Sequence, residues 1–80
     1  MALTEIRSEM AGSVLKILVT VDDVVEAGTP VIVLESMKME IPIVAPFRGR
    51  VAEIFVVEAA SVLGDQLMAT LERVGLDGPA

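Results

Sequence analysis

The side chains in this sequence that are best suited to chemistry surround a lysine with a methionine on each side. They form one run near the middle of the 80 residues: Glu35, Ser36, Met37, Lys38, Met39 and Glu40. The ordinary pKa of a lysine amine is about 10.4, so at neutral pH it is mostly protonated and becomes a nucleophile only when it loses that proton. A lysine held at an exposed turn is useful as an attachment point for a covalently bound group.

Apolar stretches on both sides of this run indicate how it is held. Residues 31–34 come before it and residues 41–44 come after it, and both stretches are rich in valine and isoleucine. Such segments favour strands, and two short strands around a polar run are typical of a β-hairpin. We therefore expect Lys38 to stand at the tip of a rigid hairpin, where another protein can reach it.

Turn signals divide the rest of the chain into further short strands. No window of helix length shows a sustained 3.6-residue apolar period. The expected strands cover residues 14–21, 24–25, 31–34, 41–45, 51–58 and 67–73. Many short strands at regular turn spacing predict an all-β sandwich or barrel.

A shift of 37 residues lays the second half of the chain on the first half without a gap. The matched positions are glycines, inward-facing aliphatics and one glutamate: Gly12 on Gly49, Val14 on Val51, Ile17 on Ile54, Val19 on Val56, Val25 on Val62, Leu34 on Leu71 and Glu35 on Glu72. A duplicated fold needs such residues twice. Each half of about four strands would leave an apolar face and sheet edges open, and packing the halves together covers both. We predict a flattened barrel with pseudo-twofold symmetry, with the lysine run at the junction of the halves.

Composition excludes several classes of function. The chain has no cysteine and no histidine, which removes disulfides, thiolate metal sites and the commonest general base. Its net charge of −6 and its two aromatic residues argue against nucleic acid as a partner, and the charge argues against an anionic membrane surface. The first residues lack the pattern of a signal peptide, and charges interrupt every long apolar run. We expect a cytoplasmic protein.

The run around Lys38 resembles the biotinylation motif of the biotinyl/lipoyl attachment domain family, which includes biotin carboxyl carrier proteins. Further matching positions lie on both sides of it: Met10-Ala11-Gly12, Val25-Glu26-Ala27-Gly28, Ile43-Val44-Ala45-Pro46, Gly49 and Val51. The resemblance covers residues 5–72. No long insertion lies between Met10 and Val25, so the chain is similar to the small members of this family that lack a protruding thumb loop.

The resemblance implies a fold and a carrier function. The fold would be a flattened β-barrel (a barrel-sandwich hybrid) of two pseudo-twofold related four-stranded halves, with residues 1–74 as the domain and 75–80 as a flexible tail. A biotin protein ligase would join biotin to the Lys38 amine. The tethered biotin would then move a carboxyl group between a biotin carboxylase and a carboxyltransferase. The chain itself would be a non-catalytic carrier, whose tether raises the effective concentration of the biotin.

The neighbours of Lys38 allow two interpretations each. Met37 and Met39 alternate with the lysine, so they are either flexible core filler or exposed side chains that the ligase recognises. Glu35 and Glu40 either orient the hairpin and contact the ligase or are two surface carboxylates beside a turn. Ser36 stands where alanine is most common in biotin carriers. The family resemblance implies recognition by the ligase for all five.

Three alternatives remain open. A lipoyl carrier domain shares the fold and the hairpin lysine, although its lysine usually lies between an acidic and a small residue. An adaptor module can use the same fold without a modified lysine. A catalytic Schiff-base lysine would need a desolvated pocket, which a hairpin tip on a small domain does not offer.

One turn departs from the family pattern. Asp22-Asp23 stands where the family usually has Gly-Asp, and the repeat matches this pair with Ala59-Ala60. Glycine reaches positive φ easily, aspartate tolerates it and alanine does so at a cost. We predict a strained or altered turn at Ala59-Ala60.

Overall fold

A computed structural model describes residues 3–74, and all of its regular structure is β. Eight strands follow one another along the chain: β1 (Leu3–Arg7), β2 (Gly12–Ile17), β3 (Val24–Val25), β4 (Pro30–Ser36), β5 (Met39–Val44), β6 (Gly49–Ile54), β7 (Ser61–Val62) and β8 (Leu67–Arg73). Residues 75–80, for which the sequence suggests a flexible tail, lie outside the described residues. A membrane-spanning helix is absent from the part of the chain that the structure describes.

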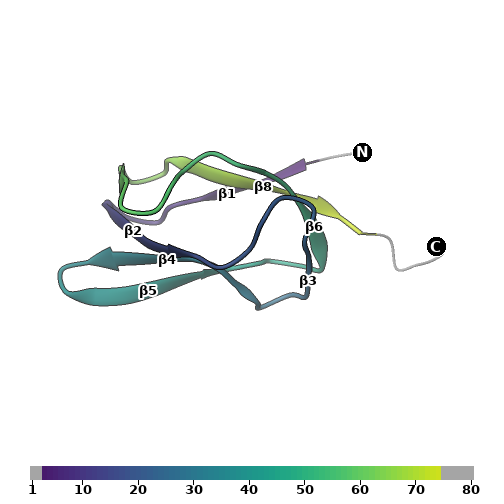
Figure 1. Ribbon diagram of the computed structural model, residues 1–80, viewed down its shortest axis with the longest axis horizontal. Helices are drawn as coiled ribbons and strands as arrows, with labels where there is room; N and C mark the ends of the chain where they lie inside the picture. Colours follow the sequence, from purple (N-terminus) through teal and green to yellow (C-terminus); the bar gives the residue numbers. More distant parts are fainter. Residues whose placement is uncertain (1–2, 75–80) are drawn as a thin grey trace.

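The strands form two antiparallel sheets that face each other (Figure 1). One sheet has the strand order β1-β8-β6-β3, and the other has the order β5-β4-β2-β7. The predicted all-β fold of two four-stranded halves is confirmed. Aliphatic side chains from both sheets fill the space between them, and Leu34, Leu71 and Met68 are fully buried there.

The 37-residue repeat is present in space, but the two copies interleave. The shift carries β1 to β5, β2 to β6, β3 to β7 and β4 to β8, so it exchanges one sheet for the other. Each sheet therefore takes two strands from each copy, rather than one copy forming one sheet. Every connection except the β4–β5 hairpin crosses from one sheet to the other, and these crossings let the two copies interleave.

Backbone hydrogen bonds repeat with the same shift. The Asp22 amide donates to the Val51 carbonyl and the Ala59 amide donates to the Val14 carbonyl, both at 2.8 Å. The same holds for the amides of Leu18 and Phe55, which donate at 2.9 and 2.8 Å to the carbonyls of the strands beside them, β4 and β8. The repeat thus describes the backbone as well as the sequence.

The sequence-based strand boundaries differ from the structure in the crossing loops. Residues 18–21 and 55–58 have strand-like composition, yet neither segment belongs to a strand. Their apolar residues serve the core instead: Val56 is buried, and Val19 packs against the buried cluster. Strands β1 and β7 were not predicted, because both are short and mix polar with apolar residues.

The turn at Ala59 has the predicted strain. Ala59 has φ 74°, close to the 81° of its repeat mate Asp22. Left-handed backbone costs an L-residue about 1–2 kcal/mol. At the next turn Asp65 has φ 63° where its repeat mate Gly28 has 84°. The second copy therefore keeps the turn geometry of the first after losing the residues that favour it.

Candidate functional site

The β4–β5 hairpin positions Lys38. Only Met37 and Lys38 lie between the two strands, and Ser36 is paired with Met39 at the last step of the ladder. The φ angles of Met37 and Lys38 are 53° and 66°. Two consecutive positive φ values in a two-residue loop mark a type I′ turn, whose twist matches that of the strands it joins.

This turn carries side chains that it does not favour. Type I′ turns prefer Asn-Gly and similar pairs, because a β-carbon at positive φ is costly. Met37 and Lys38 both occupy that conformation, so the hairpin gives up about 1–2 kcal/mol for each of them. Strain that persists at a surface position points to a function at that position.

The side chains at the tip are open to solvent. Met37 is 91% exposed and Met39 is 62% exposed, and Lys38 between them is exposed as well. The interpretation of the methionines as core filler is therefore wrong. Because Lys38 is exposed, its side chain lacks the desolvated surroundings that a Schiff-base lysine needs.

The root of the hairpin is fixed to strand β2. The Ser36 hydroxyl donates to the Ala11 carbonyl at 3.0 Å. Gly12 lies so close to the hairpin that a β-carbon there would come within 2.6 Å of the Glu35 carbonyl oxygen. These contacts hold the strands rigid up to Ser36, so the position of Lys38 is well defined relative to the barrel.

Two carboxylates face each other across the hairpin. Glu35 is paired with Glu40 in the β4–β5 ladder, and both are exposed. Like charges directly opposite each other destabilise a strand pair. Among the described residues neither carboxylate forms an ion pair.

The repeat mate of Glu35 is Glu72, and its carboxylate has a basic partner. Glu72 accepts hydrogen bonds from Arg50, whose guanidinium also contacts Asp22 at 2.6 Å. The hydrogen bond and charge of Glu72, and then those of Asp22, raise the pKa of Arg50 above its ordinary value. Ser13 is the repeat mate of Arg50 and cannot neutralise Glu35. The hairpin thus lacks the arginine that balances the same position in the other copy.

Two apolar side chains that the sequence analysis did not assign to the site lie beside the hairpin. Met10 precedes Ala11, whose carbonyl accepts the hydrogen bond from Ser36. A β-carbon built on Gly64 would lie about 4 Å from the Met10 Cα and the Ala11 nitrogen. Leu63, next to Gly64, is 72% exposed and Met10 is 42% exposed. Figure 1 shows the start of β2, the turn after β7 and the hairpin at the same end of the molecule. The repeat could have pointed to Leu63 from sequence alone, because it matches this apolar residue with the charged Glu26.

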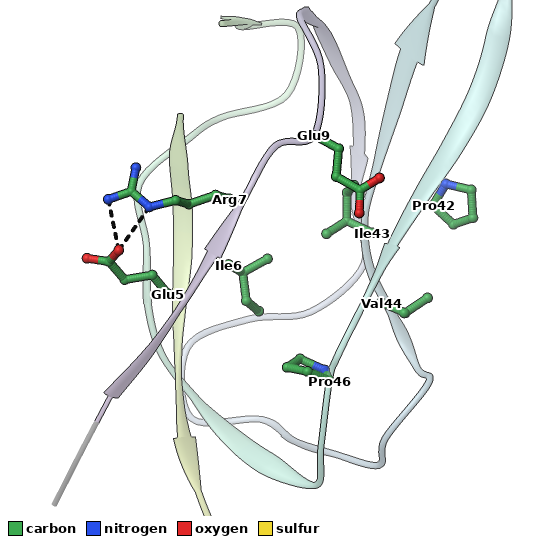
Figure 2. Close-up of a pocket in the computed structure, with 8 residues that line it drawn as sticks. All are labelled: Glu5, Ile6, Arg7, Glu9, Pro42, Ile43, Val44 and Pro46. Carbon is green, nitrogen blue, oxygen red and sulfur yellow. Dashed lines mark hydrogen bonds and ion pairs between the residues drawn. The ribbon is translucent and has the colours of Figure 1, made fainter. Parts of the chain in front are cut away.

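A small cavity lies away from this site, between the edge strands β1 and β5 (Figure 2). Its volume is 220 Å³, below the roughly 300–1,000 Å³ of typical ligand pockets. Its lining consists of repeat mates from the two strands: Glu5 and Pro42, Ile6 and Ile43, Arg7 and Val44, Glu9 and Pro46. Arg7 is engaged by Glu5 and by the Asp65 carbonyl. The cavity is a seam on the pseudo-twofold axis, and it contains none of the predicted site residues.

Comparison with known proteins places this site in context. The Biotin_lipoyl family, described as "Biotin-requiring enzyme", matches residues 4–71. The biotin carboxyl carrier protein of Streptococcus mutans is 45% identical over 60 residues, which are 74% of this chain and 46% of that protein. The biotinylated protein TB7.3 homolog of Mycobacterium leprae is 34% identical over 67 residues, which are 84% of this chain and 94% of that one. The family match takes in the hairpin and both copies of the repeat.

The fold also matches part of a solved carboxylase. The crystal structure of the Kluyveromyces lactis urea carboxylase aligns with a TM-score of 0.83 and 32% identity, covering 89% of this chain and 6% of that chain. The chain therefore spans about half the length of the streptococcal relative and a small part of the urea carboxylase. The likeness concerns one segment of these longer proteins.

Proposed function

The chain belongs to the family described as "Biotin-requiring enzyme", and from this membership we propose that it is a biotin carboxyl carrier with biotin bound covalently to Lys38. One observation supports this most directly. The amine that would hold the biotin stands on a strained two-residue turn, exposed and flanked by exposed methionines. The protein domain would comprise residues 1–74.

The geometry suits attachment by a separate enzyme. Once a base has taken one proton from the Lys38 ammonium, the neutral nitrogen would attack the acyl carbon of an activated biotinyl-adenylate. AMP would leave, and the nitrogen would release a second proton as the amide forms. Lys38 has no general base beside it in the described hairpin, where the nearest titratable groups are Glu35 and Glu40 at the second paired positions from the turn. The base would therefore belong to a biotin protein ligase.

The exposed flanks suit recognition by that ligase. Methionine adapts its shape to a partner and is enriched at protein interfaces. The opposed carboxylates of Glu35 and Glu40 would be relieved by basic groups on the ligase, while Ser36 keeps the hairpin root on β2.

The rigid hairpin also suits delivery. Bound biotin supplies a ring nitrogen that accepts a carboxyl group and gives it up again. The chain's own part is to hold the tether at one end of a firm barrel, so that each encounter with a biotin carboxylase or a carboxyltransferase is nearly intramolecular. We propose that the chain catalyses neither step and acts in the cytoplasm.

The test is the intact mass of the chain after co-expression with a biotin protein ligase, with peptide mapping of the shifted fragment. We expect the mass of one biotin, added on the peptide that contains Lys38. A lipoyl increment, or no increment, would overturn the assignment in favour of a lipoyl carrier or an unmodified adaptor.

A further inference from the structure

The barrel has two ends that the pseudo-twofold axis relates, and one of them carries the hairpin together with four large exposed apolar side chains. The hairpin end carries Met10, Met37, Met39 and Leu63. We call the related end, which carries Glu26, Phe47, Arg48 and Arg73, the far end. The fold is the same at both ends, so differences between them are not required by the fold.

The far end shows what the fold accepts at these positions. Glu26 is the repeat mate of Leu63 and forms an ion pair with Arg48 at 3.1 Å. Phe47 is the repeat mate of Met10, is half-buried and lies under the Arg73 guanidinium, 4.0 Å from its ring centre. The fold therefore accepts an ion-paired glutamate and a phenylalanine covered by arginine at these two positions. The exposure of Leu63 and Met10 needs another explanation.

The apolar residues of the hairpin end come from chain segments that lie next to one another. The chain from Leu63 to Gly64 flanks Met10 and Ala11, as the 3.9 Å approach between a β-carbon built on Gly64 and the Met10 Cα shows. Ala11 in turn accepts the hydrogen bond from Ser36, which precedes Met37. Grouped apolar side chains on a soluble surface mark an interaction site.

The reach of an unmodified lysine indicates which partner fits this surface. Five single bonds separate the Lys38 Cα from its amine, a reach of roughly 6 Å at ordinary bond lengths. An enzyme that acylates this amine must therefore bring its active site against the hairpin end. Once a tether is attached, the later partners can stay farther away.

Resting on the proposed attachment at Lys38, we propose that Met10 and Leu63 complete an apolar platform with Met37 and Met39, on which the acylating ligase docks. The platform belongs to the folded domain, since its residues come from three distant segments. A short peptide that contains only the Met-Lys-Met run therefore lacks half of it.

The test is steady-state kinetics of biotin incorporation by a biotin protein ligase into the whole chain, with Leu63→Gln and Met10→Gln as variants. Glutamine is chosen because Glu26 shows that a side chain of this shape is accepted, and because it leaves the charge near Lys38 unchanged. Val24→Gln is the matched control, since Val24 is 52% exposed and lies in β3 opposite Arg50, at the other end of the barrel. We expect KM to rise about tenfold for Leu63→Gln and about threefold for Met10→Gln, with kcat within twofold, and no change for the control.

Equal KM values for Leu63→Gln, Met10→Gln and Val24→Gln would overturn the platform while leaving the attachment site intact. A wild-type chain that accepts lipoyl groups instead of biotin would overturn the cofactor, and the same variants measured with a lipoyl ligase would then decide the platform. A wild-type chain that neither ligase modifies would refute both proposals. Urea unfolding of each variant shows whether a changed KM reflects a changed fold.

Discussion

The hairpin end and the far end of the barrel have the same backbone and opposite surface chemistry. At the far end three of the matched positions are balanced: Glu26 meets Arg48, Glu72 meets Arg50, and Phe47 is covered by Arg73. At the hairpin end Glu35 opposes Glu40, and Met37 and Leu63 are open to solvent.

This difference separates what the fold requires from what the site requires. Residues that both ends share, such as Gly12 and Gly49 or Leu34 and Leu71, maintain the barrel. At the matched positions named here, the hairpin end leaves charge or apolar surface exposed where the far end does not. These are the differences that the proposed ligase platform accounts for.

The largest expected effect is at Lys38, the proposed attachment residue at the tip of the hairpin end. Lys38→Arg should abolish attachment of biotin, because a guanidinium stays protonated and does not attack an activated acyl group. The exposed position should leave the unfolding free energy unchanged. Intact mass after co-expression with a ligase measures the first expectation. Biotin found on the arginine variant would move the site elsewhere.

Gly12 and Gly49, which the repeat matches, should differ in how well they tolerate a side chain. Gly49→Ala should cost about 3 kcal/mol and Gly12→Ala about 1 kcal/mol, within the range for overpacking. A β-carbon at Gly49 would approach the Glu72 carbonyl at 2.7 Å and the buried Leu71 at 2.8 Å. At Gly12 the close neighbour is the Glu35 backbone carbonyl at 2.6 Å, and no buried side chain adds to that contact. Urea denaturation measures both, and equal losses would show that the hairpin root is as rigid as the core.

Shortening the methionines should weaken modification without weakening the fold. We expect Met37→Ala and Met39→Ala each to raise the KM of the ligase several-fold, up to about 1 kcal/mol of binding free energy. The unfolding free energy should stay the same, since both side chains are exposed. Ligase kinetics and urea denaturation measure the two quantities. Unchanged kinetics would make the methionines ordinary surface residues.

Removing the strain from the second-copy turn should stabilise the protein. Ala59→Gly relieves a β-carbon at φ 74° but adds freedom to the unfolded chain, so we expect a net gain of about 0.5 kcal/mol. Ala60→Gly is the control: Ala60 is not among the residues with positive φ, and it should lose a similar amount. Thermal and urea unfolding measure the difference, and a loss at Ala59 would show that the turn is unstrained.

The smallest expected effect comes from giving the hairpin the charge balance of the far end. Ser13→Arg places a guanidinium at the repeat position of Arg50, next to Glu35, its neighbour in the β2–β4 ladder. We expect a gain of a few tenths of a kcal/mol that shrinks as salt is added. The reciprocal variant Arg50→Ser should lose stability. A gain that does not depend on salt would contradict the electrostatic explanation.

The sequence alone was sufficient for the hairpin and the repeat, because both are expressed by neighbouring residues or by a fixed shift. The turn at Ala59 was also predictable, since its strain depends on one residue type at one backbone conformation. The crossing loops were not predictable, because Val19 and Val56 face the core from loops as they would from strands. The exchange of strands between the two copies depends on where those loops cross.

The part of the proposed site beyond the hairpin could not be predicted from the sequence either. Met10 and Leu63 lie 28 and 25 positions from Lys38 in the sequence, and an isolated exposed methionine or leucine needs no explanation. Their meaning comes from the hydrogen bond between Ser36 and Ala11 and from the contrast with Glu26 and Phe47. Only the folded chain brings these residues together.

The pairing of β1 with β8 has a consequence for synthesis. A ribosome delivers β1 first and β8 last, so the sheet that contains them is incomplete until the final strand has left the exit tunnel. The β4–β5 hairpin can pair earlier, but Leu63 and its turn follow Lys38 at its tip by 25 residues. An enzyme that needs the whole hairpin end would pass over nascent chains, and the group on Lys38 would then mark domains that have finished folding.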